Sequence, residues 1–419
     1  MAVLKIEGGR ALSGRVAVEG NKNSALPLIA ACMLTDQPCE LANVPRIRDV
    51  EVLLDLIETL GARVEGRGTG QLRIQCERVT GDRPDAALVG RLRGSVLLLG
   101  PLLARVGSAR LAPPGGDFPA RRTISTHVEA LVAMGAVPLD EPGHALHAPD
   151  GLKGASIYLD EASVTGTETA LLAAVSAAGP SDIRHAAMEP HVVELCEFLQ
   201  GMGAGIEGAG TSRIRVQPPA RLGRASHRLA GDYIEAGSWG VVAAITNGEI
   251  EVTGARSADL EVIAAPLVKM GLDCSYDDDR LVVRPSSLRA VRRITTGLWP
   301  GFPSDLVSLV TVLATQADGR TLVHDWLYEL RLFALEQMSA MRADLFLCDP
   351  HRLIVSGPTK LRGRALDSRD LRSGMALIAA ALAAEGESTV APLETVERGY
   401  ASLIERLRSL GAQVERVER

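Results

Sequence analysis

The pattern of apolar positions over residues 50–64 predicts an amphipathic helix that leads into a strand. Its apolar side chains recur at the three- and four-residue spacing of a single helix face. They are Val50, Leu53, Leu54, Ile57 and Leu60. Asp49 is expected to cap the start of this helix, and Gly61 to end it in the left-handed conformation. Residues 63–65 and 72–74 then alternate between polar and apolar like half-buried strands.

This helix–glycine–strand pattern recurs along the whole chain. Clear copies end at Met202, Met270 and Leu410, each followed by a glycine, and weaker copies end at Met134 and Met341. The junctions fall at positions 61, 135, 203, 271, 342 and 411, an almost constant interval of about 70 residues. Six such units indicate an internal repeat. The period is too long for an open solenoid, so the repeats are expected to pack into compact domains.

Each repeat also carries a second helix, which is almost uncharged on every side. These helices are Ala25–Leu34, Ser95–Val106, Thr169–Ala178, Ser238–Thr246, Leu306–Thr315 and Gly374–Ala384. A helix that is apolar all round is buried on all sides. One buried and one amphipathic helix per repeat, with strands between them, predict the α/β fold class, with two domains that each hold three repeats around buried central helices.

The two chain ends bear on the domain organisation. Residues Val3–Ile6 and Gly14–Glu19 have the pattern of strands, but they have no partner within the first repeat. They are expected to pair with the C-terminal half of the chain. This predicts a first domain of residues 21–230 and a second, discontinuous domain of residues 1–20 plus 231–419.

Polar residues before the buried helices indicate anion binding. Helix N-termini carry about half a positive charge and unpaired N–H groups, which favour anions. Ordinary N-capping explains residues such as Ser163 and Asp305 at these places, but Lys22, Arg93 and Arg372 are poor caps. Six helix ends, three per domain, with added cations therefore predict an anion-binding cleft.

Composition narrows the class of protein. The 419 residues are 46% hydrophobic but only 3% aromatic, so the core is expected to consist mainly of Leu, Val, Ile and Ala. A net charge of −6 argues against general nucleic-acid binding. No basic leader and no run of about twenty apolar residues occurs, so a soluble, cytoplasmic protein without a membrane partner is expected.

The cysteines show neither a CxxC pair nor a metal-type spacing with histidine. We expect them to be buried thiols in a reducing compartment, with no metal site. They are Cys32, Cys39, Cys76, Cys196, Cys274 and Cys348.

A set of short motifs, taken in order, resembles the UDP-N-acetylglucosamine 1-carboxyvinyltransferases over essentially the whole chain. This family, also called UDP-N-acetylglucosamine enolpyruvyl transferase, belongs to the EPSP synthase-like enolpyruvyl transferase superfamily. The motifs are Lys22-Asn23, Arg93-Gly-Ser95, Pro114-Gly-Gly-Asp117, Arg122 with His127, Ser163-Val-Thr-Gly166, Asp232-Tyr-Ile-Glu235, Phe302-Pro-Ser-Asp305, Glu329-Leu-Arg331, Asp370-Leu-Arg372 and Arg398-Gly-Tyr400. The resemblance implies two inside-out α/β domains with an active-site cleft between them.

The resemblance also implies a reaction. The enolpyruvyl group of phosphoenolpyruvate would pass to the 3-hydroxyl of UDP-N-acetylglucosamine with release of phosphate, the first committed step of peptidoglycan precursor synthesis. Phosphoenolpyruvate and a uridine nucleotide sugar would be the partners, and no cofactor or metal would be needed. Phosphoenolpyruvate would be bound by Lys22, Asn23, Arg122, Arg331, Arg372 and Arg398. The nucleotide sugar would be bound by Arg93, Arg122, Thr123, Ile124, Ser125, Thr126, Glu161, Ala162, Ser163, Val164, Asp305 and Leu327.

Four residues would take part in the chemistry by the same resemblance. Asp305 corresponds to the carboxylate that contacts the attacking hydroxyl, the place of a general base. Lys22 and Arg398 would hold phosphoenolpyruvate while it reacts. Asp117 lies in a turn-rich segment, residues 111–122, at a lid position that is a cysteine in many members and an aspartate in others. Its expected role is to donate a proton to the methylene carbon.

Two departures from the family pattern leave the acceptor open. Ser125 stands where relatives carry a carboxylate near the uracil base, and Glu161 stands where some carry a lysine near the diphosphate, which a glutamate would repel. An enolpyruvyl transferase that acts on another nucleotide, such as uridine monophosphate in a secondary pathway, is therefore an alternative. A non-catalytic paralogue that binds a nucleotide sugar is a third reading. Retention of Asp117 and Asp305 argues against it, because a binding protein has no use for a base beside the acceptor.

Overall fold

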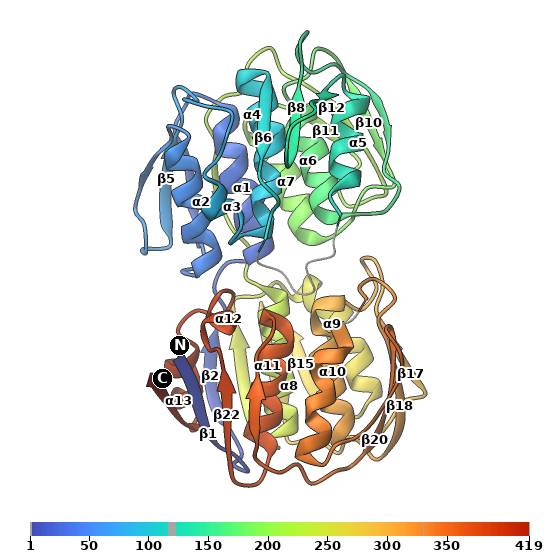
Figure 1. Cartoon of the computed structure of the whole chain (residues 1–419). Coiled ribbons are helices and arrows are strands. Elements are labelled where there is room, and N and C mark those ends of the chain that lie inside the picture. Colours follow the sequence, from blue (N-terminus) through green and yellow to red (C-terminus); the bar gives the residue numbers. More distant parts are fainter. Residues whose placement is uncertain (1, 116–122, 330, 419) are drawn as a thin grey trace. The chain divides into compact units, whose positions relative to one another are not determined.

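The computed structural model describes residues 2–115, 123–329 and 331–418 of the chain. The chain forms two compact units. Unit 1 comprises Met1–Glu19 and Gly231–Arg419, and unit 2 comprises Gly20–Ala230. Figure 1 follows the chain through both units.

One motif, strand–helix–strand–helix–strand–strand, underlies both units. Its four strands form one sheet in the order first, second, fourth, third; the first pair is parallel and the other pairs are antiparallel. Among the described residues, five sheets follow this order, and the three-stranded sheet of the second repeat lacks the parallel first strand. The internal repeat that the sequence predicts is thus present in the backbone.

The strands of unit 2 are β3 (Cys39–Ala42), β4 (Arg63–Glu65), β5 (Gln71–Gln75), β6 (Ser108–Leu111), β7 (Val137–Pro138), β8 (His144–His147), β9 (Ser156–Tyr158), β10 (Ser181–Arg184), β11 (Gly205–Glu207), β12 (Arg213–Gln217) and β13 (Ser226–Arg228). The helices of unit 2 are α1 (Lys22–Ala31), α2 (Arg48–Thr59), α3 (Ala86–Val89), α4 (Leu99–Val106), α5 (Ser125–Ala133), α6 (Val164–Ala174) and α7 (Pro190–Gly201), with the 3₁₀ helices η1 (Cys32–Leu34) and η2 (Arg93–Leu98).

The strands of unit 1 are β1 (Ala2–Glu7), β2 (Ser13–Ala17), β14 (Glu249–Thr253), β15 (Asp273–Asp277), β16 (Arg280–Arg284), β17 (Arg293–Thr295), β18 (Gly319–His324), β19 (Asp344–Asp349), β20 (Arg352–Gly357), β21 (Ala365–Asp367), β22 (Glu387–Ala391) and β23 (Gln413–Glu418). The helices of unit 1 are α8 (Tyr233–Ile245), α9 (Ser257–Lys269), α10 (Val307–Thr315), α11 (Leu371–Ala383), α12 (Glu394–Glu397) and α13 (Leu403–Ser409), with the 3₁₀ helices η3 (Ser304–Leu306) and η4 (Arg331–Met341).

The first two strands of the chain complete sheets of the C-terminal half, as the sequence predicts. β2 pairs in parallel with β14, and β1 lies between β22 and β23, antiparallel to both. β2 is therefore the first strand of the fourth repeat, and β1 is the last strand of the sixth. In return, β13, which comes last along unit 2, pairs with β3 as the first strand of the first repeat.

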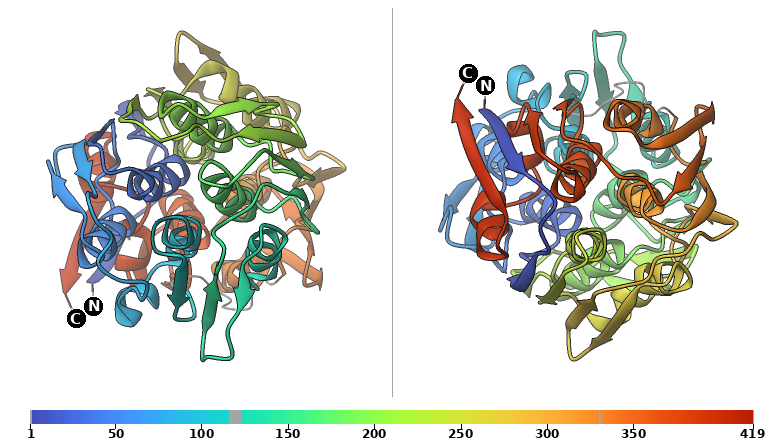
Figure 2. Two further views of the ribbon diagram at one scale, coloured as in Figure 1. Left: turned by 90° about the horizontal axis from the view of Figure 1, so that it is seen from above. Right: turned by 90° about the horizontal axis from the view of Figure 1, so that it is seen from below.

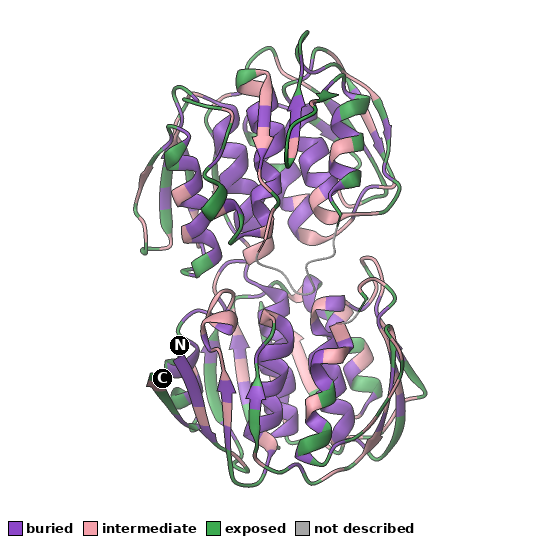
Figure 3. Cartoon of the chain, viewed as in Figure 1, coloured by how far each residue is buried: buried purple, intermediate pink, exposed green. Residues whose placement is uncertain are grey.

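The helices with apolar surfaces all round form the centre of each unit, which confirms that prediction. In Figure 2, right, α8, α10 and α11 are seen end-on with the sheets outside them, and Figure 3 shows the central helices of both units as buried. Every residue of α8 and α10 is buried. In unit 2, a Cβ on Gly100 of α4 would meet Leu172 of α6 at 3.1 Å, so the glycine permits this close packing.

Four central helices begin three to five residues earlier than expected. Their first turns are fixed by the side chains of Asn21, Ser163, Asp232 and Asp370, each of which accepts a hydrogen bond from a backbone N–H two or three residues on. Consequently Lys22 and Arg372 lie inside the first turns of α1 and α11 rather than before them.

The outer helices α2, α5, α7 and α9 agree with the repeated stripe. All six junction positions adopt a positive φ; five are glycines, and the sixth is Arg342, at 73°. Two of the expected copies differ from an α-helix of full length. The copy that ends at Met341 is the 3₁₀ helix η4, and the last copy begins only at Leu403.

The expected N-cap at Asp49 is wrong. Helix α2 begins at Arg48, and its N-cap residue is Ile47, which makes no side-chain cap hydrogen bond. Asp49 instead forms an ion pair with Lys22 at 2.6 Å. An acidic residue in the first turn of a helix is favourable without being the cap.

The expectation that all six cysteines are buried is only partly right. Cys32, Cys39, Cys76 and Cys196 are buried, but Cys274 is half-buried and Cys348 is exposed on β19; all are free thiols. Within the described ranges, no helix combines the length and the apolarity that crossing a membrane requires.

Candidate active site

Asp305 is the centre of a partly buried charge cluster in unit 1. It lies in η3, at the N-terminal side of the central helix α10, and its side chain is 26% exposed. One oxygen, Oδ1, accepts from Arg331 Nη1 at 3.2 Å. The other, Oδ2, accepts from Arg372 Nε at 3.1 Å and from Arg372 Nη2 at 2.8 Å. Two guanidinium groups therefore hold the carboxylate predicted to act as base.

Arg331 is held on three sides. Its Nη1 also donates to Ser304 Oγ at 2.7 Å, and its guanidinium lies 4.6 Å from the centre of the Tyr328 ring. Burial alone would lower the pKa of Arg331, but the negative charges of Asp305 and Asp325 outweigh it and raise that pKa above its usual value. The arginine is thus a permanent cation.

Arg372 owes its position to the cap of α11. Asp370 accepts from the backbone N–H groups of Arg372 and Ser373 at 2.9 and 3.0 Å, which fixes the first turn. On the other side, the buried Tyr400 shares a hydrogen bond with Ser238 of α8 at 2.7 Å. Burial raises the pKa of Tyr400 to about 12, although the charge of Arg372 opposes this. The phenol stays neutral beside the cation.

Arg398 and Leu327 belong to the same unit. Arg398 is half-buried at the C-terminal end of α12, and a Cβ on Gly399 would meet the Leu371 side chain at 2.6 Å, so this segment packs against the first residue of α11. Leu327 donates its backbone N–H to Asp325 Oδ1 at 3.3 Å. The structure therefore brings Asp305, Arg331 and Arg372 into direct contact and places Arg398 and Leu327 on neighbouring segments.

Unit 2 carries the remaining described residues. Lys22 and Asn23 open the central helix α1, and the side chain of Lys22 is 16% exposed and paired with Asp49. At the start of η2, a Cβ on Gly94 would meet Leu26 at 2.9 Å, so Arg93 directly precedes a residue that contacts α1. Two cations thus lie near the N-terminal ends of two central helices.

A second group surrounds the start of α5. Arg93 Nη2 donates to the Thr123 carbonyl at 2.8 Å, and Thr123 Oγ1 accepts from the Ser125 N–H at 3.0 Å. Ile124 and Thr126 are buried, whereas Ser125 is exposed. Arg93 therefore fixes the segment that the resemblance assigns to the nucleotide.

The segment 161–164 packs against that start. Thr126 donates to the exposed Glu161 at 3.5 Å, and Ser163 caps α6 by accepting from the Gly166 N–H at 3.2 Å. Ala162, Ser163 and Val164 are half-buried. A Cβ on Gly166 would lie 3.0 Å from Thr126, so the two helix starts are in close contact.

His127 is buried beneath this contact. Its Nε2 lies 2.8 Å from Thr165 Oγ1 of α6. Burial, aided by the charge of Arg93, lowers the pKa of His127 to about 3. The imidazole is therefore neutral and ties α5 to α6 as a structural hydrogen-bond partner.

Two predicted residues, Asp117 and Arg122, lie outside the described residues. The segment before them is anchored, because Gly115 donates its N–H to the Val89 carbonyl at 3.2 Å. No group of three or more His, Cys, Asp or Glu side chains in the described part of the chain is arranged to hold a metal ion.

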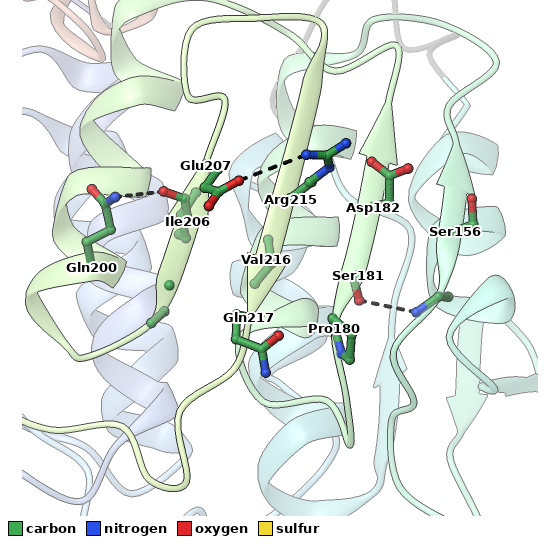
Figure 4. A pocket seen from close by; sticks show the side chains of 13 residues that line it. Ser156, Pro180, Ser181, Asp182, Gln200, Ile206, Glu207, Arg215, Val216 and Gln217 are labelled. Carbon is green, nitrogen blue, oxygen red and sulfur yellow. Dashed lines mark hydrogen bonds and ion pairs between the residues drawn. The ribbon is translucent and has the colours of Figure 1, made fainter.

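A hollow of about 760 Å³ lies over the sheet of β9 to β12, and none of the predicted residues that the structure describes lines it (Figure 4). Arg215 in the hollow lies 4.0 Å from Glu207, and Asp182 is bound by Arg213 at 2.8 Å. Each charged side chain that lines the hollow therefore has an ion-pair partner.

Comparison with known proteins identifies the family. A family model described as EPSP synthase (3-phosphoshikimate 1-carboxyvinyltransferase) matches residues 6–407. The chain belongs to the EPSP synthase family. This match confirms two predictions from the sequence: that the chain belongs to this superfamily, and that it is an enzyme that transfers an enolpyruvyl group.

Two similar relatives are each named UDP-N-acetylglucosamine 1-carboxyvinyltransferase. The protein of Bradyrhizobium diazoefficiens is 43% identical over 98% of this chain and 97% of its own length, and that of Treponema denticola is 40% identical over 99% of both. The resemblance seen in the motifs extends over the full length.

Solved structures confirm the fold. The enolpyruvyl transferase NikO from Streptomyces tendae superposes with a TM-score of 0.88 at 26% identity, covering 99% of both chains. EPSP synthase from Acinetobacter baumannii superposes with a TM-score of 0.79 at 18% identity over the whole of both chains, which shows the shared fold alone.

Two residues contact the predicted site although the sequence analysis did not assign them to it. Asp49 resembles an N-cap, and nothing in the sequence indicates that its carboxylate reaches Lys22. Asp325 follows β18 without belonging to any motif, and its role depends on contacts with segments 20–30 residues away along the chain.

Proposed function

We propose that this chain transfers the enolpyruvyl group of phosphoenolpyruvate to the 3-hydroxyl of UDP-N-acetylglucosamine and releases phosphate. The observation that carries the proposal is the cluster of Asp305 with Arg331 and Arg372. A carboxylate fixed between two buried arginines combines a proton acceptor with cations for a phosphate or carboxylate. Relatives at 40–43% identity with the corresponding name support the acceptor.

In this proposal the proton balance is simple. Asp305 takes the proton of the 3-hydroxyl as the hydroxyl oxygen bonds to C2 of phosphoenolpyruvate. Asp117 delivers a proton to the methylene carbon. Phosphate then leaves C2 with the proton that Asp305 has taken, and Asp117 takes a proton back from the new methyl group, which restores the double bond. Lys22, Arg331 and Arg372 would bind the anionic groups during these steps.

The proposed acceptor site consists of residues of unit 2 that contact one another. Arg93 and the segments 123–126 and 161–164 would bind the uridine and its phosphates. Glu161 is the exception, because its exposed carboxylate is unfavourable to a diphosphate. A uridine monophosphate carries fewer phosphates to repel and is therefore the second candidate acceptor. The names of the relatives at 40–43% identity support UDP-N-acetylglucosamine as the first candidate.

A phosphate-release assay tests the proposal. Phosphoenolpyruvate is incubated with the protein and, separately, with UDP-N-acetylglucosamine, uridine monophosphate or no acceptor. We expect phosphate only with UDP-N-acetylglucosamine, together with a product whose mass increases by one enolpyruvyl group. Release with uridine monophosphate alone would move the proposal to the second acceptor, and no release with either would refute it.

A further inference from the structure

Asp325 is a buried carboxylate that no predicted motif contains. It follows β18 directly, and its residue is 0% exposed. Its Oδ1 accepts from Thr296 Oγ1 at 2.8 Å and from the Leu327 N–H at 3.3 Å, and its Oδ2 accepts from Ser304 Oγ at 2.7 Å. A carboxylate hidden from water is costly unless donors satisfy it, and here three donors do.

The backbone of Asp325 is held as firmly as its side chain. Its N–H donates to the His351 carbonyl at 2.9 Å, and His351 Nδ1 donates to the Asp325 carbonyl at 2.7 Å. β17 and β18 are parallel, and Thr296 and Asp325 each follow the C-terminal end of one of them. Carboxyl ends of neighbouring parallel strands are a common location for functional side chains.

Ser304 relays this anchor to the charge cluster. Because a carboxylate oxygen only accepts, the Ser304 hydroxyl must donate its proton to Asp325. Its lone pairs are then left to accept from Arg331 Nη1 at 2.7 Å. Arg331 in turn donates to Asp305 at 3.2 Å. A continuous chain of hydrogen bonds thus runs from Asp325 to the proposed base.

We infer that Asp325 is a positioning residue that sets the placement of Arg331 through Ser304 and of Leu327 through its backbone N–H. This inference rests on the proposed function, in which Arg331 binds an anionic group of the substrates, and on the family resemblance, which assigns Leu327 to the nucleotide-sugar site. Because Asp325 is 0% exposed, we expect it to contact neither substrate and to act only through these residues.

The substitution Asp325→Asn keeps the size of the side chain but reverses the polarity at one atom. Two donors converge on Oδ1 and one on Oδ2, so the amide oxygen is expected at Oδ1 and the NH₂ group opposite Ser304. The Ser304 hydroxyl would then accept from both the amide and Arg331, and its own proton would lose the acceptor that fixes its direction. Arg331 would be held less firmly as a result. We expect the affinity for phosphoenolpyruvate to fall about 10–100-fold, the range for a hydrogen bond to a charged group.

The test is a double-mutant cycle of Asp325→Asn with Ser304→Ala, read as phosphoenolpyruvate binding by calorimetry at saturating UDP-N-acetylglucosamine. We expect the double variant to be no weaker than the weaker single one, because both changes break one chain. Ser304→Thr, which keeps the hydroxyl, should bind like wild type. Asp349→Asn is the matched control. Asp349 accepts from the N–H of His351, the residue that binds the Asp325 backbone, at 2.9 Å, but it is not part of the chain of hydrogen bonds through Ser304.

Wild-type affinity in Asp325→Asn, or losses that multiply in the double variant, would overturn the inference. If Asp325→Asn does not fold, Thr296→Val removes one donor from the same carboxylate, and an unchanged affinity in that variant would also overturn it. A crystal structure of Asp325→Asn is the readout that needs no reaction: Arg331 shifted away from Asp305 is expected, and an unmoved Arg331 contradicts the role. Absence of phosphate release by the wild type refutes the proposed function separately.

Discussion

Arg372 donates two hydrogen bonds, from Nε at 3.1 Å and Nη2 at 2.8 Å, to the single oxygen Oδ2 of Asp305. The arginine side chain is 8% exposed and belongs to the capped first turn of α11, so the guanidinium cannot easily follow a moving carboxylate. Asp305 is therefore fixed before any substrate arrives. A preorganised carboxylate of this kind spends little free energy on reorganisation during a reaction.

The first prediction concerns Asp305 itself. Asp305→Asn keeps the shape and removes the proton acceptor, so we expect turnover to fall about 10²–10⁴-fold, the usual worth of a positioned general base. Binding of the nucleotide sugar, measured by calorimetry, should survive. Asp318→Asn, an exposed position beyond the far end of α10, is the control. Near wild-type turnover in Asp305→Asn would show that another group takes the proton.

Arg372→Lys tests the fork of hydrogen bonds. Lysine keeps the charge but offers one point donor instead of a planar fork, so Asp305 is held less firmly. We expect kcat/KM for phosphoenolpyruvate to fall about 10–100-fold. Arg369→Lys is a matched control, because this arginine lies three residues earlier and binds the exposed Asp367 at 3.2 Å. Equal losses in both variants would mean that the fork has no special role.

The sequence predicts the architecture well because the same pattern of helices and strands can be read independently in each of the six repeats. The apolar stripes and the left-handed junctions recur, so a weak pattern in one repeat can be interpreted from the clearer patterns in the others. Prediction fails where tertiary contacts override the local signal. The last stripe begins at Tyr400, but the helix starts only at Leu403, because Tyr400 is drawn into the core toward Ser238.

The pattern before the central helices predicts anion binding near Lys22, Arg93 and Arg372, but the roles of single residues were predictable only through family motifs. These name Asp305, Arg331 and Arg372, but the spacing of single residues does not show that their side chains meet. Asp325 shows the limit most clearly. It belongs to no motif, and its importance arises from hydrogen bonds with Thr296, Ser304 and His351, which only the folded chain brings together.

Glu161→Lys tests the nucleotide site. Glu161 is exposed and accepts a 3.5 Å hydrogen bond from Thr126 at the contact of α5 and α6. If a diphosphate lies near it, replacing the negative charge with a positive one should lower the KM for UDP-N-acetylglucosamine about 2–10-fold, a modest effect because the position is solvated. The KM for phosphoenolpyruvate should not change.

Asp160→Lys makes the same change of charge one residue earlier, also at an exposed position, and measures the long-range part of the effect. The gain should shrink as salt is added, since exposed charges are screened. A KM that is equal in the two variants would place the diphosphate elsewhere. Improved activity with uridine monophosphate alone would favour the second acceptor.

The last prediction uses Glu168, a buried carboxyl of α6 whose Oε1 has no hydrogen-bond partner among the residues that the structure describes. Burial, and next the charge of Glu189, raise the pKa of Glu168 well above 4.5. The folded state therefore keeps a proton that the unfolded chain releases above about pH 4.5. Where the native state binds more protons, the free energy of unfolding falls as the pH rises. The stabilising contribution is thus complete below pH 4.5 and is lost as the pH rises toward the folded-state pKa.

Glu168→Gln carries no such proton, so its free energy of unfolding lacks this pH dependence. The difference between the variant and the wild type should therefore shift in favour of the variant as the pH rises, by up to about 1.4 kcal/mol per pH unit. Urea unfolding from pH 4 to pH 8, compared between the two proteins, measures this slope. Glu197→Gln, at an exposed position of α7, should run parallel to the wild type throughout. Parallel curves for Glu168→Gln would mean that Glu168 is ionised in the folded protein, and its burial in α6 would then need a cationic partner.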